Sequence, residues 1–359
     1  MFPAPPSSRT AHTPSPWPAI ALAVLAMGGC GGRIDEAEAR GTIVADTDRA
    51  AHDTDAPTAV RRLTGDDATH VRMRNVYFRL SDRIVLHVRR LTGEMRATTP
   101  GAPINFDDSR SFSIAIDSAE VGMSEAALSA LLNEHVFAYR GAPLRRIRVT
   151  MENGNVVQSG VLRKAMSVPF TITSTVSAMP DGTIRLHPVK TRIMGIGARG
   201  LMQALDIELE DVIDVTKARG VTVRGNDLYL DPDSLLPPPR ISGRVVAVRV
   251  EGRSLVQTFA QTRRSRAEQA AEGGDGRGNY MYYRGGTLRF GKLFMVDADM
   301  RIVDADTSDP FDFSLDRYNE QLVRGYSVTL PSLGLEVHMP DLADAATGGP
   351  KVAAAPRRP

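Results

Sequence analysis

Apolar and polar residues alternate along a series of short segments between residues 71 and 250. The clearest segments are Phe112-Ile114-Ile116, Ile147-Val149-Met151 and Val246-Val248-Val250. Because neighbouring side chains of a β-strand point to opposite faces, this alternation indicates strands with one buried and one solvated face. Such strands are typical of antiparallel sheets, whereas strands of parallel sheets are apolar on both faces. The chain is therefore predicted to be rich in antiparallel strands.

Two turn sequences indicate how neighbouring strands are joined. Glu152-Asn153-Gly154-Asn155 and Met179-Pro180-Asp181-Gly182-Thr183 each place Asn or Asp before Gly between alternating segments. These residues tolerate the positive φ that tight hairpin turns require. The strands on either side of each turn are therefore predicted to pair as hairpins, which makes the sheet a meander.

The first of two predicted helices begins after Ser124 and runs to about Ala138. Ser124 is a favourable N-cap, and Glu125 places a negative charge at the positive end of the helix dipole. The apolar residues that recur at helical spacing are Leu128, Leu131, Leu132 and Val136. This stripe predicts an amphipathic helix with one buried face.

The second predicted helix extends from about Leu201 to Ala218, and Gly220 suits the left-handed position that follows a helix. The apolar residues that we assign to one face of it are Leu201, Leu205, Leu209, Val212 and Ile213. Many strands with only two widely spaced helices indicate an α+β fold with an antiparallel sheet, and not a series of βαβ units.

The single cysteine, Cys30, ends an apolar run that begins at Ala19 and includes Gly28-Gly29. This arrangement resembles a bacterial lipoprotein signal, although Met27 stands where leucine is usual and the leader is rich in proline. The resemblance implies that Cys30 is lipidated and anchors an exported protein in the cell envelope. Gly31, in place of Asp, favours the periplasmic face of the outer membrane. The alternatives are an ordinary cleaved signal and an apolar N-terminal anchor, with Cys30 as a bystander.

Composition along the chain predicts its organisation into segments. Residues 1–29 are expected to be the signal peptide, and the polar, alanine-rich residues 30–68 a flexible tether. Residues 69–342 are expected to form the folded α+β domain. The glycine-rich stretch within residues 263–279 is expected to be a mobile loop, and residues 343–359 a disordered tail.

The charge balance argues against nucleic acid as a partner. The chain has 44 Lys and Arg residues against 42 Asp and Glu residues, so it lacks the broad positive charge of nucleic-acid-binding proteins. A single cysteine excludes an intramolecular disulfide and a cysteine-rich metal site. After the leader, we find no segment long and apolar enough to span a bilayer.

The motifs that could indicate catalysis or a cofactor are weak. Gly195-Ile196-Gly197-Ala198-Arg199-Gly200 matches the dinucleotide-binding pattern GxGxxG, but the preceding segment carries Pro188 and a polar face. No serine lies in a GxSxG elbow, and the seven histidines, His87, His135 and His338 among them, are scattered. We therefore expect no catalytic residue, no cofactor and no enzymatic activity.

Aspartates cluster between Asp297 and Asp312. Oxygen-rich loops can hold Ca²⁺, but this stretch lacks the central glycine and the terminal glutamate of an EF-hand loop. A solvated turn or an arginine-paired loop is the alternative, and we expect no metal site.

Residues from about Ala119 to Phe259 resemble a known family in the order of elements and in their turn sequences. These include the helix after Ser124, the turn at Asn153-Gly154, Val168-Pro169-Phe170, Asp181-Gly182-Thr183-Ile184-Arg185-Leu186 and Gly225-Asn226-Asp227-Leu228-Tyr229-Leu230-Asp231. The stretch is similar to the LmeA-like phospholipid-binding domain of the tubular lipid-binding (TULIP) superfamily. The resemblance implies a curved antiparallel meander that wraps around one or two amphipathic helices and leaves an apolar groove for acyl chains.

The leading hypothesis is a non-catalytic lipid-binding or lipid-handling lipoprotein, with a phospholipid or another acyl-chain ligand as its partner. The residues expected to contact the lipid are Leu128, Leu131, Leu132, Phe170, Ile172, Val176, Leu205, Leu209 and Val212. The same residues would also be needed in a dry core, so an envelope scaffold with a solid core is the alternative. That scaffold would dock an envelope protein through Tyr280-Met281-Tyr282-Tyr283 and the segment Tyr318–Val328. An envelope hydrolase is a third hypothesis, which rests only on scattered Ser, His and Asp residues.

Overall fold

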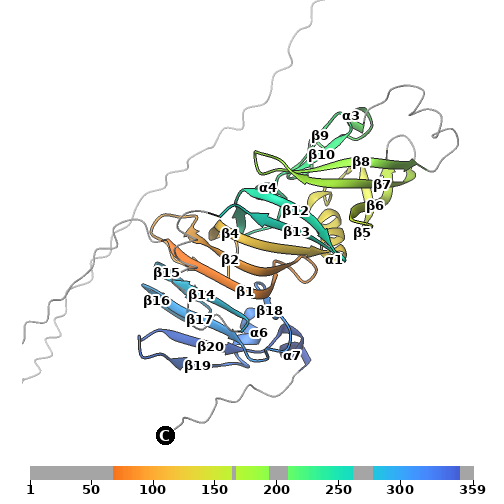
Figure 1. Cartoon of the computed structure of the whole chain (residues 1–359). Coiled ribbons are helices and arrows are strands. Elements are labelled where there is room, and N and C mark those ends of the chain that lie inside the picture. Colours follow the sequence, from red (N-terminus) through yellow and green to blue (C-terminus); the bar gives the residue numbers. More distant parts are fainter. Residues whose placement is uncertain (1–67, 164–166, 194–208, 262–277, 348–359) are drawn as a thin grey trace, which may run out of the picture. The chain divides into compact units, whose positions relative to one another are not determined.

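The computed structural model of the chain describes residues 68–163, 167–193, 209–261 and 278–347 (Figure 1). The chain divides into two units, Met1–Val60 and Arg61–Pro359, and every described residue belongs to the second unit. The predicted signal peptide, Cys30, the predicted tether up to residue 67 and the GxGxxG motif lie outside the described residues.

Eleven of the described strands form one large sheet. Nine follow one another across it in the order β12 (Val245–Glu251), β13 (Ser254–Phe259), β4 (Phe112–Ser124), β2 (Val85–Ala97), β1 (Thr69–Arg79), β14 (Tyr280–Arg284), β17 (Asp299–Asp304), β20 (Leu335–Met339) and β19 (Tyr326–Thr329). The strand β11 (Arg240–Ser242) pairs with β4, and β18 (Phe311–Ser314) pairs with β1. Most pairs are antiparallel and the sheet is curled, as Figure 1 shows, which confirms a β-rich α+β fold.

The alternation along β1 changes phase at Asn75. Val71 and Met73 are buried before it, and Val76 and Phe78 are buried after it. Asn75 has a φ of 49°, a left-handed conformation that asparagine adopts more readily than most residues. We call the face that carries these four buried side chains the inner face of the large sheet, and the opposite face the outer face.

A second sheet is wholly antiparallel, and its first four strands form a meander. Its strands follow the order β5 (Leu144–Glu152), β6 (Asn155–Arg163), β7 (Ser167–Ala178), β8 (Ile184–Ile193), β10 (Asp227–Leu230) and β9 (Val221–Arg224). Both predicted hairpins are confirmed. Asn153 and Gly154 have φ values of 50° and 78° between β5 and β6, and Met179 N–H donates to the Thr183 carbonyl (2.8 Å) between β7 and β8.

A small sheet and an aromatic cluster complete the described core. The small sheet consists of β16 (Leu293–Val296), β15 (Thr287–Phe290) and β3 (Ile104–Asn105). Phe106 lies against Phe290 and Tyr283, with ring centroids 5.2 and 5.4 Å apart. Tyr318, in the short helix α6 (Tyr318–Leu322), packs on Phe290 at 4.3 Å. Tyr283 and Tyr318, part of the predicted docking segments, are therefore buried.

The predicted first helix is confirmed in its start and differs in its second half. Ser124 caps α1 (Glu125–Leu131), because its Oγ accepts a hydrogen bond from Ala127 N–H (3.2 Å). The chain then continues as a π-helix, η1, over Leu132–Val136.

Helix α1 and η1 cover the free edge of β5 with side chains. Glu125, Ser129 and Asn133 recur every four residues and so lie on one helix face. Their oxygens accept the backbone N–H groups of Met151 (2.8 Å), Val149 (2.9 Å) and Ile147 (2.9 Å) in turn. The helix thus supplies the hydrogen bonds that a further strand would otherwise make, which protects this edge from pairing with another chain.

The second predicted helix is shorter than expected in its described part. Helix α3 spans only Leu209–Val212, although the prediction continued to Ala218. Asp214 explains the end, because its Oδ1 accepts the N–H (3.0 Å) and the hydroxyl (2.7 Å) of Thr216. Such side-chain bonds compete with helical backbone bonds. Residues 201–208 lie outside the described residues.

Two predicted irregular segments contain ordered residues. Helix α7 covers Leu342–Thr347, where the tail was predicted to begin, because Leu342 and Ala345 are buried. Asn279, at the end of the predicted loop 263–279, is also buried and donates to Asp304 (2.8 Å). In the described residues, no helix is long and apolar enough to cross a membrane, and a sheet wrapped around the helices is not shown.

Candidate functional site

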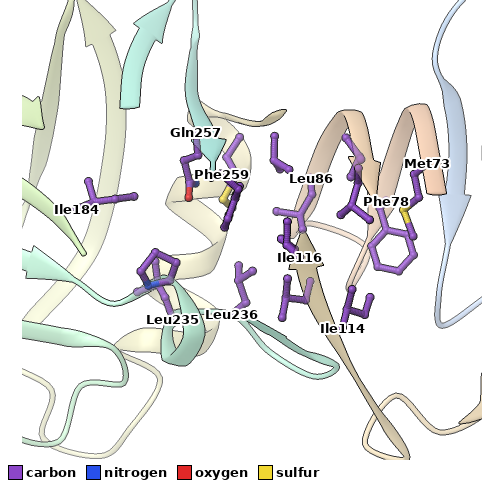
Figure 2. A pocket seen from close by; sticks show the side chains of 16 residues that line it. Met73, Phe78, Leu86, Ile114, Ile116, Ile184, Leu235, Leu236, Gln257 and Phe259 are labelled. Atoms are coloured by element: carbon purple, nitrogen blue, oxygen red, sulfur yellow. The ribbon is translucent and has the colours of Figure 1, made fainter. Parts of the chain in front are cut away.

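An apolar cavity of about 50 Å³ lies on the inner face of the large sheet (Figure 2). Strands β1, β2, β4, β11 and β13 form one side of it, and β8 and the short helix α4 (Pro232–Leu235) form the other. The lining residues are Met73, Phe78, Leu86, Val88, Leu91, Ile114, Ile116, Val121, Met123, Ile184, Pro232, Leu235, Leu236, Ile241, Gln257 and Phe259. Among these lining residues, Gln257 is the one with a polar side chain.

The strand residues line the cavity because side chains two residues apart on a strand point to the same face of the sheet. Ile114 and Ile116 are two residues apart on β4, and Gln257 and Phe259 are two residues apart on β13. Figure 2 labels these four side chains among the residues that line the cavity. The cavity is therefore the part of the sheet's inner face that neighbouring side chains do not fill completely.

The backbone of Gly243 lies close to two of these side chains. A Cβ atom added to Gly243 would lie 2.9 Å from both Ile116 Cβ and Phe259 Cδ1. Because real Cβ contacts are longer, only glycine fits at this position without a shift of its neighbours. The glycine thus permits the dense packing around the cavity.

Helix α4 is a single turn whose position depends on capping. Asp231 Oδ1 accepts the N–H of Asp233 (3.1 Å), and Pro232 occupies the first turn, where no backbone donor is needed. Asp233 Oδ1 in turn accepts the N–H of Gly243 (3.1 Å). These hydrogen bonds attach the wall that carries Leu235 to the chain beside β11.

The predicted lipid-contacting residues lie elsewhere in the same hydrophobic core. Those buried in it are Leu128, Leu131, Leu132, Phe170, Ile172 and Leu209, and Val176 packs against it partly buried. None of these seven described residues lines the apolar cavity. Leu205 and the side chain of Val212 lie outside what the structure describes, and a role of the whole set in lipid contact stays a prediction.

The alternating pattern predicted the strands that line the cavity, but it did not predict which of their residues line it. Phe78, Leu86 and Ile114 belong to segments whose alternation predicted a buried face, and nothing in that pattern separates a cavity wall from a filled core. For the opposite wall a signal existed, since Asp231-Pro232 is typical of a helix start. Its contribution to the cavity follows only from the pairing of β11 with β4.

The volume of the cavity limits what it can hold in this conformation. An engineered apolar cavity of ~150 Å³ binds benzene in another protein. A space of about 50 Å³ therefore admits only a small apolar group, such as the end of an acyl chain. A longer segment could enter only if a wall moved.

The lining offers no group for acid–base or nucleophilic catalysis. It contains no Asp, Glu, His, Lys, Cys, Ser or Tyr side chain among the described residues. His87, on the outer face, lies 3.1 Å from Asn75 Oδ1, and burial lowers its pKa. Burial likewise lowers the pKa of His135. The lining of the cavity is suited to binding an apolar group.

The acidic stretch that suggested calcium makes hydrogen bonds within the protein. Asp304 accepts from the side chain of Asn279 (2.8 Å) and from Asp306 N–H (2.9 Å). Asp341 accepts from Asp312 N–H (2.7 Å). Across the described ranges, no three His, Cys, Asp or Glu side chains are grouped in a way that could hold a metal ion.

Comparisons with known proteins add no relative. A scan against protein-family models, a search of curated proteins and a search of solved structures found no match for this chain. The resemblance to the LmeA-like domain therefore remains a prediction from the sequence.

Proposed function

We propose that this protein is a non-catalytic, lipid-binding lipoprotein of the bacterial cell envelope. The observation that carries the proposal is the apolar cavity, which is lined almost entirely by aliphatic and aromatic side chains. Ligand pockets are typically apolar with few polar groups, and here the single polar lining side chain is Gln257. Such a lining favours an acyl chain over a polar ligand.

The proposed complex requires movement of one wall. The cavity holds only the end of an acyl chain, so the rest of the chain must displace α4 or pass between the two sheets. Helix α4 is a single turn, and its displacement would break the hydrogen bond from Gly243 N–H to Asp233 Oδ1 and expose the buried side chain of Leu235. Displacement would extend the apolar space within the core that also contains Leu128, Leu131 and Phe170. A TULIP-like groove around the helices belongs to this proposal.

Anchoring through an acylated Cys30 is the second part of the proposal. The acyl groups would hold the protein at the membrane, with the periplasmic face of the outer membrane as the proposed location. Residues 31–68 would let the folded unit reach lipid near that surface. A membrane-tethered body with an apolar cavity suits lipid carriage or sensing without catalysis.

Recovery of bound lipid tests the proposal. The full chain is purified from a bacterium, and bound lipid is extracted and identified by mass spectrometry. The variant Ile116→Phe fills the cavity and is expected to reduce bound lipid several-fold. The matched control Val246→Phe changes an exposed residue of β12 outside the lining and is expected to retain it. Thermal unfolding checks that both variants fold.

The small volume of the cavity favours a second candidate, an envelope scaffold with an essentially solid core. A wild-type protein that carries no lipid and ignores added phospholipid vesicles would contradict lipid binding. Recovery of a stable envelope protein in that case would support the scaffold. Equal lipid content in wild type and Ile116→Phe would show that the lipid lies outside the cavity.

A further inference from the structure

The outer face of the large sheet carries a groove of about 510 Å³ in which cations predominate. Its lining includes Arg72 and Arg74 from β1 and Arg89 and Arg90 from β2, with Glu120 from β4 as the only carboxylate among the described lining residues. We call this feature the arginine groove. It lies behind the apolar cavity, because the two are on opposite faces of β1 and β2.

A break in the alternation along β2 brings Arg89 and Arg90 to the same face of the sheet. Val88 and Leu91 are buried on the inner face, so one of the two residues between them has to break the alternation. The register of β2 against β4 shifts between Val88 and Arg90. Arg89 and Arg90 consequently both reach Glu120 on the outer face, at 3.0 and 3.2 Å.

Arg74 and Arg90 are direct cross-strand partners between β1 and β2. Like charges at such positions destabilise a sheet, because their Cβ atoms lie within about 5.5 Å of each other. Arg90 has 65% of its side chain exposed, and Arg74 is exposed and its side chain makes no hydrogen bond or ion pair with a described residue. A high arginine content explains the number of arginines but not this opposed pair.

Glu120 neutralises only part of this charge. It accepts hydrogen bonds from Arg249 (2.7 Å) and Arg89 (3.0 Å), and these bonds lower its pKa, so it is ionised near neutral pH. Its ion pair with Arg90 uses the remaining oxygen. Glu120 therefore orders the guanidinium groups of one wall, and Glu251 also pairs with Arg89 at 2.6 Å. Among the residues that the structure describes, no carboxylate pairs with Arg74 on the other wall.

The floor of the groove is polar and buried. Thr92 and Ser118 line it and are 6% and 7% exposed, and their side-chain oxygens lie 3.1 Å apart. These two hydroxyl groups are hydrogen-bonded to each other, so the guanidinium groups on the sides are the donors for phosphate oxygens, and a planar guanidinium can bind them with two hydrogen bonds.

We propose that the arginine groove binds a phosphate-bearing anion between Arg74 and Arg90. The anion would offset the repulsion between the two guanidinium groups and contact the walls formed by Arg72 and Arg89. Its source is the phosphate of a lipid headgroup or a free phosphate compound, since both present the same oxygens. This site is independent of the apolar cavity and goes beyond the proposed binding of an acyl chain.

The test uses the full chain with Cys30→Ser, so that protein-bound acyl groups do not attach it to vesicles. Pyrophosphate binding is measured by calorimetry at constant ionic strength, with chloride as the reference anion. Arg74→Gln with Arg90→Gln is expected to weaken binding by about tenfold or more. The control Arg140→Gln with Arg145→Gln removes the same charge at exposed positions outside the groove and is expected to change binding by less than about twofold.

A second arm identifies the source of the phosphate. Cosedimentation is measured with phosphatidylcholine vesicles that contain phosphatidylglycerol. Vesicle binding that the groove variant loses and the control keeps supports a headgroup, whereas pyrophosphate binding without vesicle binding supports a free phosphate compound. The proposal is overturned if neither probe binds, or if the groove variant and the control bind both probes alike. Lipid content in the apolar cavity is measured separately, so the two proposals can fail independently.

Discussion

The neighbours of Gly243 lie so close to it that they leave no room for a side chain. Alanine there would place Cβ 2.9 Å from Ile116 and Phe259, so both cavity-lining side chains would have to move. We expect Gly243→Ala to lower the free energy of unfolding by about 1–3 kcal/mol, as overpacking does. Urea unfolding measures the effect.

Gly122 supplies the matched control for that substitution. A Cβ added to Gly122, on β4, would lie 3.8 Å from its nearest neighbours, which is an ordinary contact. Gly122→Ala is expected to leave stability unchanged or to raise it slightly, because alanine has less backbone freedom in the unfolded chain. Equal losses in both variants would show that packing at Gly243 is not the cause.

Asp341 is a carboxylic acid whose ionisation depends on its surroundings. Burial raises its pKa to about 7, and the charges of Asp304, Asp309 and Asp312 add to the shift. Since the folded pKa is above the unfolded value, the protonated form stabilises the fold. This contribution is complete below about pH 4 and is lost as the pH rises through 7.

The substitution Asp341→Asn should therefore make stability less dependent on pH. An amide oxygen can still accept the N–H of Asp312, so the hydrogen bond is retained. At pH 8 we expect the variant to be more stable than the wild type by on the order of 1–2 kcal/mol, a figure reduced for solvent screening at a partly exposed group. At pH 4 the difference should vanish. A constant difference across chemical denaturation curves at pH 4, 6 and 8 would contradict the argument.

At the scale of elements, the contact between helix and strand edge is the feature most open to test. Asn133 Oδ1 accepts Ile147 N–H, and its Nδ2 donates to the Ile147 carbonyl (2.6 Å). Asn133→Ala would leave both backbone groups of Ile147 unpaired at the edge of β5. We expect a loss of about 2–3 kcal/mol in unfolding free energy and faster hydrogen exchange at that edge. Asn155→Ala, in the exposed hairpin after β5, should change stability by less than about 0.5 kcal/mol.

The same contact shows which elements sequence patterns can predict. The N-cap at Ser124 and the turn at Asn153-Gly154 depend on interactions within a few residues, so their signals are local. Helix α3 ends earlier than predicted because the side chain of Asp214 binds Thr216, a choice that apolar spacing alone does not reveal. The change to a π-helix after Leu131 likewise had no signal in the stripe. Edge capping by Glu125, Ser129 and Asn133 depends on a neighbour that the helix sequence does not specify.

At the scale of the whole molecule, the expected anchor is the feature with the largest consequence. We predict that the full chain incorporates a palmitate analogue in a bacterium and fractionates with membranes. Cys30→Ser should lose the label and a large part of the membrane association, because the acyl groups supply most of the membrane affinity. Labelling that persists in Cys30→Ser would contradict lipidation at this residue. Ser124→Ala serves as a control that should leave labelling unchanged.

The β-rich class, the two hairpins and the start of the first helix could be predicted from the amino-acid sequence, since they depend on alternation, turn chemistry and capping. Which buried residues surround a cavity depends on tertiary packing, because walls such as β1 and α4 lie far apart in the chain. Pairing between strands also places Arg74 opposite Arg90, because neither strand alone specifies the register of β1 against β2. Local free energies select elements, whereas long-range packing selects the neighbours of each side chain.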